Sequence, residues 1–90
     1  MHKSNGIKVI ILDSGVDIEE IEDVRIIRIK SQDYNLLIFK DYSPLIGEID
    51  GNIVIEGNTT IRYDNIKGFY SISRNIFHLI INEKGMQSDN

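Results

Sequence analysis

This sequence has no cysteine, no tryptophan and a single proline, Pro44. Without cysteine the chain can form neither a disulfide framework nor a thiolate zinc site. No apolar run reaches the roughly 18 residues that a transmembrane helix needs. The first six residues also lack the apolar segment of a signal peptide. These absences predict a cytoplasmic location.

The sequence also has no excess of positive charge. Ten lysines and arginines stand against 14 aspartates and glutamates, which gives a net charge of −4 and a pI near 5.0. The basic residues are spread along the chain, usually with an acid nearby. Because binding to phosphate groups depends on clustered lysine and arginine, we expect neither nucleic acid nor a membrane surface as a partner.

The chain is long enough for one domain, which we predict to span residues 1–90 with flexible termini at about 1–5 and 85–90. Hydrophobic residues make up 41% of it and charged residues 27%. This balance is too apolar for a disordered chain and typical of a small globular fold. Isoleucine dominates the apolar set, and β-branched residues favour strands.

Short apolar or alternating segments separated by turn residues recur every eight to twelve positions, roughly the spacing typical of a small all-β fold. We therefore predict a mainly β (or α+β) protein, in which a small antiparallel sheet closes into a sandwich or barrel. The spacing of Ile18 and Ile21 after Asp17 predicts at most one short helix, near residues 18–22. Asp50-Gly51-Asn52 predicts a hairpin turn. Further turns are predicted at 41–44, 57–58, 64–65 and 74–75. The predicted strands are 9–12, 24–30, 34–40, 46–49, 53–55, 59–63, 69–73 and 76–82.

The most distinctive segment is Val-Ile-Ile-Leu-Asp-Ser-Gly-Val-Asp at residues 9–17, a buried-strand pattern that ends on Asp13. With Lys8 before it, this segment resembles the one that carries the catalytic aspartate of subtilisin-like serine proteases. The resemblance implies that Asp13 orients a histidine. The histidine and serine motifs of that family are absent from the rest of the chain, so no catalytic residue is predicted.

A structural role for Asp13 is the alternative, with its carboxylate accepting backbone hydrogen bonds in the turn that follows. The acids between Asp13 and Asp23 also suggest two interpretations. They could supply oxygen ligands to Ca²⁺, but their spacing does not match an EF-hand loop. A solvated helix face explains them better, and we predict no metal and no cofactor.

Most of the aromatic residues lie in predicted strands, and no basic patch accompanies them, so core packing is the expected role. Tyrosines that remain exposed would suit a protein-binding face. His78 lies between Ile76 and Ile80 in an alternating strand. The candidate binding residues are Asp13, Tyr42, Tyr63, Tyr70 and His78.

We therefore predict a non-catalytic module that binds a protein or peptide through an edge strand or through tyrosine-rich hairpins. Residues 59–85 resemble, in the order of their strands, part of a pleckstrin-homology-type barrel. Two alternatives stay open. One is a detached or degenerate fragment of a subtilisin-like protease that supplies Asp13 in a complex. The other is a structural assembly subunit whose edge strands pair with other subunits.

Overall fold

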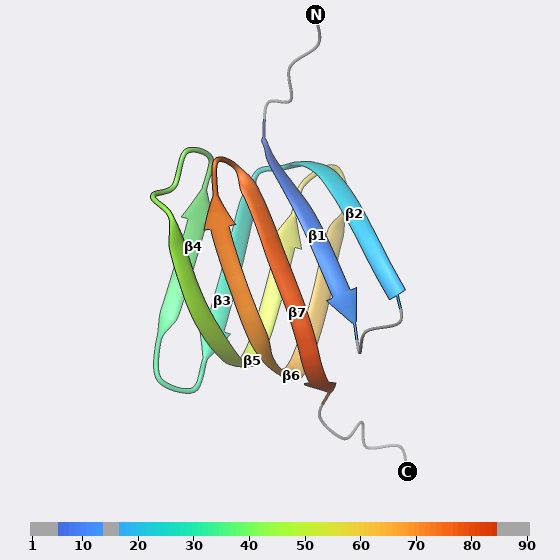
Figure 1. Ribbon diagram of the computed structural model, residues 1–90, viewed down its shortest axis with the longest axis vertical. Coiled ribbons are helices and arrows are strands. Elements are labelled where there is room, and N and C mark those ends of the chain that lie inside the picture. The colour runs from blue at the N-terminus through green and yellow to red at the C-terminus, as the bar shows by residue number, and fades with distance from the viewer. Residues whose placement is uncertain (1–5, 14–16, 85–90) are drawn as a thin grey trace, which may run out of the picture.

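The computed structural model describes residues 6–13 and 17–84, and every regular element in that part of the chain is a β-strand (Figure 1). The predicted mainly β fold is confirmed. The predicted flexible termini lie outside the described residues. The seven strands are β1 (Ile7–Asp13), β2 (Asp17–Val24), β3 (Ile26–Ser31), β4 (Asn35–Phe39), β5 (Leu45–Glu56), β6 (Thr60–Ser73) and β7 (Ile76–Lys84).

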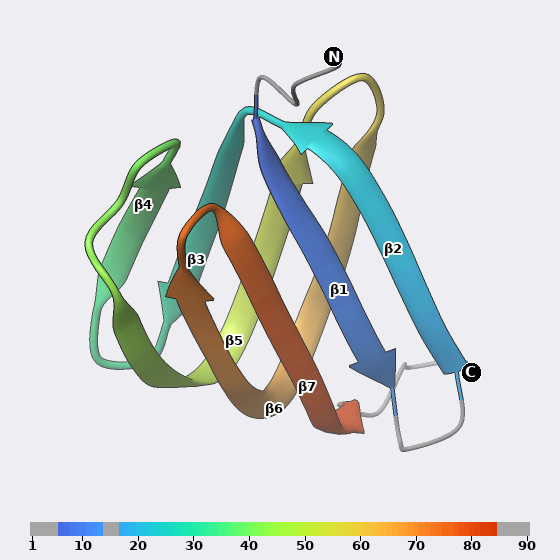
Figure 2. The same ribbon diagram turned by 45° about the horizontal axis from the view of Figure 1, so that its top comes forward.

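All seven strands form one hydrogen-bonded sheet in the order β2-β1-β7-β6-β5-β3-β4. Neighbouring strands are antiparallel except β1 and β7, which run parallel, so that the first and the last strand lie side by side (Figures 1 and 2). The outermost strands of the sheet are therefore β2 and β4. The predicted antiparallel sheet is thus, in detail, a mixed one.

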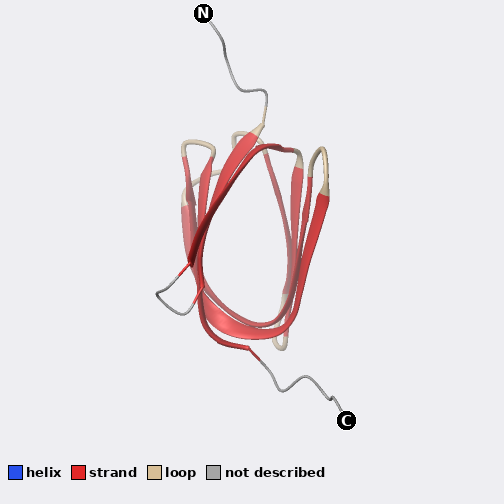
Figure 3. Cartoon of the chain, turned by 90° about the vertical axis from the view of Figure 1, so that its right-hand side faces the viewer, coloured by secondary structure: helices blue, strands red, loops and turns tan. Residues whose placement is uncertain are grey.

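The sheet bends on itself to make two facing layers (Figure 3). The bend runs through the two longest strands, β5 and β6. There the register of β5 with β6 shifts between Gly51 and Ile53, and the register of β6 with β7 shifts between Lys67 and Gly68. One layer holds β2, β1, β7 and the adjoining halves of β6 and β5. The other layer holds β3, β4 and the remaining halves. Bulges of this kind sharpen the local twist of a strand and so allow a sheet to fold over.

Between the layers lies a core made almost wholly of aliphatic side chains. Each strand alternates, so that one set of its side chains points into the core and the other set points outward. No buried polar or charged residue occurs in the described part of the chain. The core residues are Ile7, Val9, Ile11, Val24, Ile27, Ile29, Ile38, Ile49, Ile53, Ile55, Ile66, Tyr70, Ile72, Phe77, Leu79 and Ile81.

The helix predicted near residues 18–22 is wrong, because this segment is part of strand β2. Its residues pair with β1, so that Ile18 lies opposite Leu12 and Ile21 lies opposite Val9. In the strand Ile18 is 68% exposed on the outer face, whereas Ile21 packs against the core. Pairing with a neighbouring strand has overridden the local helical spacing. The acids of this segment consequently line an edge strand.

The hairpin predicted at Asp50-Gly51-Asn52 is also wrong, because these residues lie inside the continuous strand β5. Gly51 does not have the positive φ of such a turn. The turn predicted at residues 64–65 likewise falls within β6, although Asn65 does have a positive φ of 56°. Both segments lie where the sheet bends.

The other predicted turns do connect strands. Residues 41–44 join β4 to β5, and residues 57–58 join β5 to β6. Arg74 and Asn75 join β6 to β7 with φ values of 52° and 61°. Two successive positive φ angles match the right-handed twist of a tight hairpin.

Candidate functional site

The outer side of the β2-β1-β7-β6 layer carries a row of apolar side chains. In the strand register Phe69 lies opposite Ile80, Ile80 opposite Leu12, and Leu12 opposite Ile18. Phe69 is 45% exposed and Ile80 is 42% exposed. Ile46 on β5 is 80% exposed on the same side. We define the outer apolar face as the five residues Ile46, Phe69, Ile80, Leu12 and Ile18. The neighbouring residues Ile11, Tyr70 and Leu79 point into the core, so alternation directs Leu12, Phe69 and Ile80 outward.

A shallow hollow lies within the outer apolar face. It is lined by Ile46, Phe69, Tyr70, Ser71, His78 and Ile80. His78, one of the predicted binding residues, lies opposite Ser71 on one side and opposite Ile10 on the other. Its side chain is exposed and makes no hydrogen bond or ion pair with any described residue. The imidazole is therefore available to an incoming surface.

Carboxylates border the outer apolar face. Glu48 on β5 lies opposite Phe69, and Glu20 on β2 lies opposite Ile10. The Glu20 carboxylate is 3.6 Å from the ammonium of Lys8, whereas Glu48 has no ion pair with any described residue. The border of the face is thus polar and partly acidic, as in the rim of a protein interface.

Asp13 and Tyr63, two more predicted binding residues, meet at one end of the molecule. The Asp13 carboxylate is 2.7 Å from the ammonium of Lys84, which in turn lies 5.9 Å from the centre of the Tyr63 ring. The Tyr63 hydroxyl donates a hydrogen bond to Glu19 at 3.5 Å. Burial raises the pKa of Tyr63, the nearby carboxylates of Glu19 and Asp13 raise it further, and Lys84 opposes them. This cluster is an ion pair against an aromatic ring, and its members within the described residues include no histidine. The turn predicted after Asp13 lies outside the described residues.

The contact between Asp13 and Lys84 predicts a measurable coupling between the two side chains. Lys84 is half exposed, so solvent screens the pair and a coupling free energy of about 1 kcal/mol is expected. Asp13→Ala should lower the free energy of unfolding more than Asp13→Asn does. A double-mutant cycle with Lys84→Ala, measured by urea unfolding, checks this expectation. Strictly additive effects would show that Asp13 acts on stability through other contacts.

Tyr70 and Tyr42 lie in different surroundings from the other predicted binding residues. Tyr70 is only 4% exposed, and its ring stacks against Phe77 with 5.7 Å between ring centres. Its hydroxyl is 2.8 Å from the hydroxyl of Tyr34, which donates to the backbone carbonyl of Glu48. Tyr42 is half-buried against the core. Tyr70 thus contacts the turn between β3 and β4 through Tyr34, and Tyr42 packs at the margin of the core.

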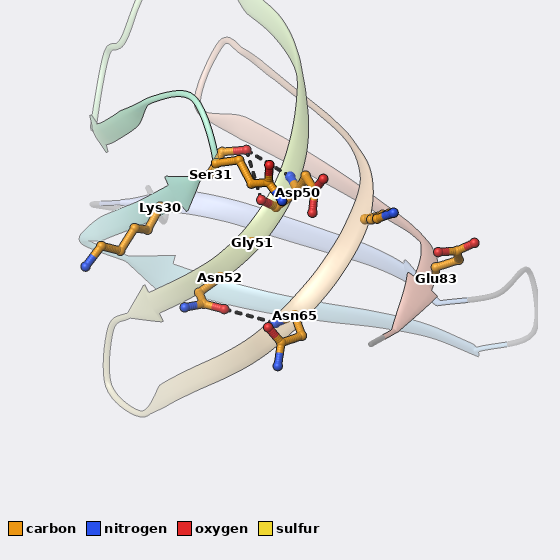
Figure 4. Close-up of a pocket in the computed structure, with 9 residues that line it drawn as sticks. Lys30, Ser31, Asp50, Gly51, Asn52, Asn65 and Glu83 are labelled. Atoms are coloured by element: carbon orange, nitrogen blue, oxygen red, sulfur yellow. Dashed lines mark hydrogen bonds between the residues drawn. The ribbon is translucent and has the colours of Figure 1, made fainter. Parts of the chain in front are cut away.

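A second, polar hollow lies where the sheet bends (Figure 4). There the Ser31 hydroxyl accepts a hydrogen bond from the Asp50 backbone N–H at 2.9 Å, and the Asn52 amide oxygen accepts one from the Asn65 N–H at 2.9 Å. Its charged residues are two lysines and two acids, so neither sign dominates. These hydrogen bonds join residues of the hollow to one another, and we assign them to holding the bend.

Within the described ranges, no three acidic or histidine side chains gather closely enough to hold a metal ion. The acids between Asp13 and Asp23 are strung along β1 and β2, and their separation follows from the extended strand. The same part of the chain contains no helix that could span a membrane.

The outer apolar face was not predicted as a site from the sequence. The available signal was β7 itself, in which Ile76 and Ile80 on one side face away from Phe77, Leu79 and Ile81 on the other. A strand that is apolar on both sides is normally covered on both sides. In this structure one of those sides is exposed.

No protein-family model matches this sequence, and no curated protein sequence resembles it. The fold, however, is similar to that of chains in two solved mitochondrial ATP synthases. One is in the OSCP/F1/c-ring assembly of Euglena gracilis, with a TM-score of 0.76 and 12% identity over 92% of this chain and 54% of that one. The other is in the central stalk/c-ring assembly of Tetrahymena thermophila, with a TM-score of 0.72 and 11% identity over 91% of this chain and 67% of that one.

At such low identity the likeness shows a shared fold and nothing further. The described residues thus form a bent β-sheet of seven strands, and the chain spans only about half of the Euglena chain. The comparisons do not bear on the resemblance of residues 8–17 to subtilisin-like proteases, which stays a prediction. The likeness of residues 59–85 to a pleckstrin-homology-type barrel also stays a prediction.

Proposed function

We propose that this protein is a non-catalytic module that binds a folded partner protein through the outer apolar face. The observation that carries the proposal is the alignment of Phe69, Ile80 and Leu12 in register across three adjacent strands, continued by Ile18 on a fourth. Contiguous exposed apolar side chains with a polar border are typical of protein interaction sites. Aromatic residues such as Phe69 often anchor these sites.

The charges around the face favour a particular kind of partner. Glu48 has no ion pair with any described residue, and the chain as a whole is negative. We therefore propose that the partner presents an apolar patch bordered by lysine or arginine. The same negative charge disfavours the anionic surface of a membrane or a nucleic acid.

The two similar structures support this function indirectly, because both are chains of multi-subunit protein assemblies. A structural subunit of a larger assembly is therefore a specific form of the same proposal. The protease-fragment alternative depends on Asp13, whose carboxylate is paired with Lys84, and no histidine of the described ranges joins this pair. We favour the binding module for that reason.

Site-specific photo-crosslinking tests the proposal. A benzophenone amino acid is placed at Ser71, within the outer apolar face, or at Thr60, an exposed position of the same strand in the other layer. In cells that contain the protein, Ser71 should give one discrete heteromeric adduct and Thr60 should not. The double variant Phe69→Ser/Ile80→Ser should abolish the adduct while the protein stays folded, because both side chains are exposed.

Three results would overturn this proposal. They are equal adducts from both positions, an adduct that persists in the double variant, and an adduct of the chain with itself. The last result would make the face a contact between copies of this protein.

A further inference from the structure

The two edges of the sheet differ sharply in charge. Strand β2 carries acids at five of its eight positions, Asp17, Glu19, Glu20, Glu22 and Asp23. Strand β4 reads Asn-Leu-Leu-Ile-Phe and carries no charge. Charged side chains on an edge strand deter unwanted pairing with other strands. By this criterion β2 is protected, whereas β4 is open to a further strand.

The backbone of β4 is suited to pair with a further strand. The N–H of Ser31 donates to the carbonyl of Tyr34 at 2.8 Å, at the turn between β3 and β4. Because bonded and non-bonded pairs alternate along an antiparallel ladder, Leu36 and Ile38 bond to β3. Asn35, Leu37 and Phe39 consequently direct their N–H and C=O groups away from the sheet.

Two of these residues, Asn35 and Leu37, line a groove. Leu37 is 42% exposed and Phe39 is 47% exposed. From Leu37 the register continues across the outer surface of the layer through Arg28 and Val54 to Arg62. The residues of the groove that bear on binding are Arg28, Lys30, Asn35, Leu37, Val54 and Arg62. The lining of the groove holds three cations and no carboxylate.

These cations stand out in a chain of net charge −4. Arg28 is 2.7 Å from Glu56, and Arg62 is 3.1 Å from Asp64, yet both arginine side chains remain at least half exposed. Lys30 has no ion pair with any described residue. An acidic ligand could therefore bind Lys30 directly, and it could also bind the two arginines alongside their present carboxylate partners.

We propose that the free edge of β4 binds an extended, acidic segment of a partner protein, which adds to the sheet as an eighth strand. The main-chain groups of Leu37 and its neighbours would supply hydrogen bonds, as in other cases of strand addition. Alternate apolar side chains of the segment would cover Leu37 and Phe39, and its carboxylates would meet Lys30 and the two arginines. This site lies on the opposite layer from the outer apolar face, and neither proposal depends on the other.

A binding assay with a defined probe tests this inference. The probe is a short fluorescein-labelled peptide that alternates glutamate with valine, and the control is the same peptide with lysine in place of glutamate. Fluorescence anisotropy should show saturable binding of the acidic peptide, at least about tenfold tighter than that of the basic one. Added salt should weaken it.

Three variants separate strand addition from simple charge attraction. Leu37→Pro removes an outward N–H without breaking the ladder to β3, and we expect it to weaken binding at least about tenfold. Leu37→Thr keeps that N–H and should change affinity by less than about threefold. Lys30→Glu leaves the edge intact and should weaken binding about fivefold or more through charge. If Leu37→Pro fails to fold, Lys30→Glu still tests whether the acidic peptide binds beside this groove.

Several outcomes would overturn the proposal. These are no saturable binding of the acidic peptide, equal binding of both peptides, and binding unaffected by Leu37→Pro in a folded protein or by Lys30→Glu. A further one is concentration-dependent self-association that Leu37→Pro abolishes. That result would make a second copy of this chain, through its acidic β2, the occupant of the edge.

Discussion

Replacing Gly51 with alanine should destabilise the protein by about 3 kcal/mol or more. A Cβ atom at this position would lie 2.1 Å from the backbone carbonyl oxygen of Lys30 on the neighbouring strand. That oxygen belongs to the main chain of β3 and cannot rotate away as a side chain would. The substitution therefore forces β5 and β3 apart at the bend. Urea unfolding of both proteins measures the difference.

Gly57→Ala is the matched control. Its Cβ would lie 3.0 Å from the carbonyl oxygen of Asp23, a tight contact that a small shift relieves. We therefore expect a clearly smaller loss of stability than for Gly51→Ala. Equal midpoints of urea unfolding for the Gly51→Ala and parent proteins would show that β5 and β3 do not approach so closely at the bend.

Gly51 also illustrates how far the sequence predicts this fold. Local signals correctly indicate a β protein and the turns at residues 57–58 and 74–75. Asp-Gly is a strong hairpin signal because a glycine takes positive φ easily. Here the same residue serves a close approach of two backbones inside a long strand. A single sequence does not distinguish these uses of glycine, since both demand the absence of a side chain.

Strand β2 shows a related difficulty. The spacing of Ile18 and Ile21 suits a helical face, yet both residues lie in a strand on opposite sides of the sheet. What decides the outcome is pairing with β1, and β1 in turn pairs with β7 from the far end of the chain. Contacts between residues so distant in sequence leave no local pattern.

The outer apolar face is hidden from sequence reasoning for the same reason. Its members come from β5, β6, β7, β1 and β2 and become neighbours only through the strand register. Of the residues predicted for binding, His78 lies in this face and Tyr70 backs it from the core. Asp13 and Tyr63 form a separate cluster. Alternation predicts which side chains share one side of a strand, but not which side stays exposed.

Tyr70 ties the outer apolar face to the core, and Tyr70→Ala should cost about 3–5 kcal/mol. Its ring is 4% exposed, stacks against Phe77 and covers Gly47 on the adjacent strand. Truncation would leave a cavity that the surrounding strands cannot close. Since the protein is a small domain with a typical stability of about 5–10 kcal/mol, much of that stability should be lost. Thermal and urea unfolding measure the loss, with Tyr70→Phe as the variant that keeps the ring.

The Tyr70 hydroxyl should also make the free energy of unfolding depend on pH in the alkaline range. Burial raises the pKa of Tyr70 well above its ordinary value of 10.0, and the hydrogen bond with Tyr34 raises it further. The folded protein therefore holds this proton more tightly than the unfolded chain does. The resulting stabilisation is fully present below pH 10 and declines as the pH rises above it, because the unfolded tyrosine ionises first. We expect the free energy of unfolding to fall more steeply above pH 10 in the parent protein than in Tyr70→Phe, which retains the other tyrosines. Parallel pH profiles for the two proteins would contradict the buried, hydrogen-bonded state of this hydroxyl.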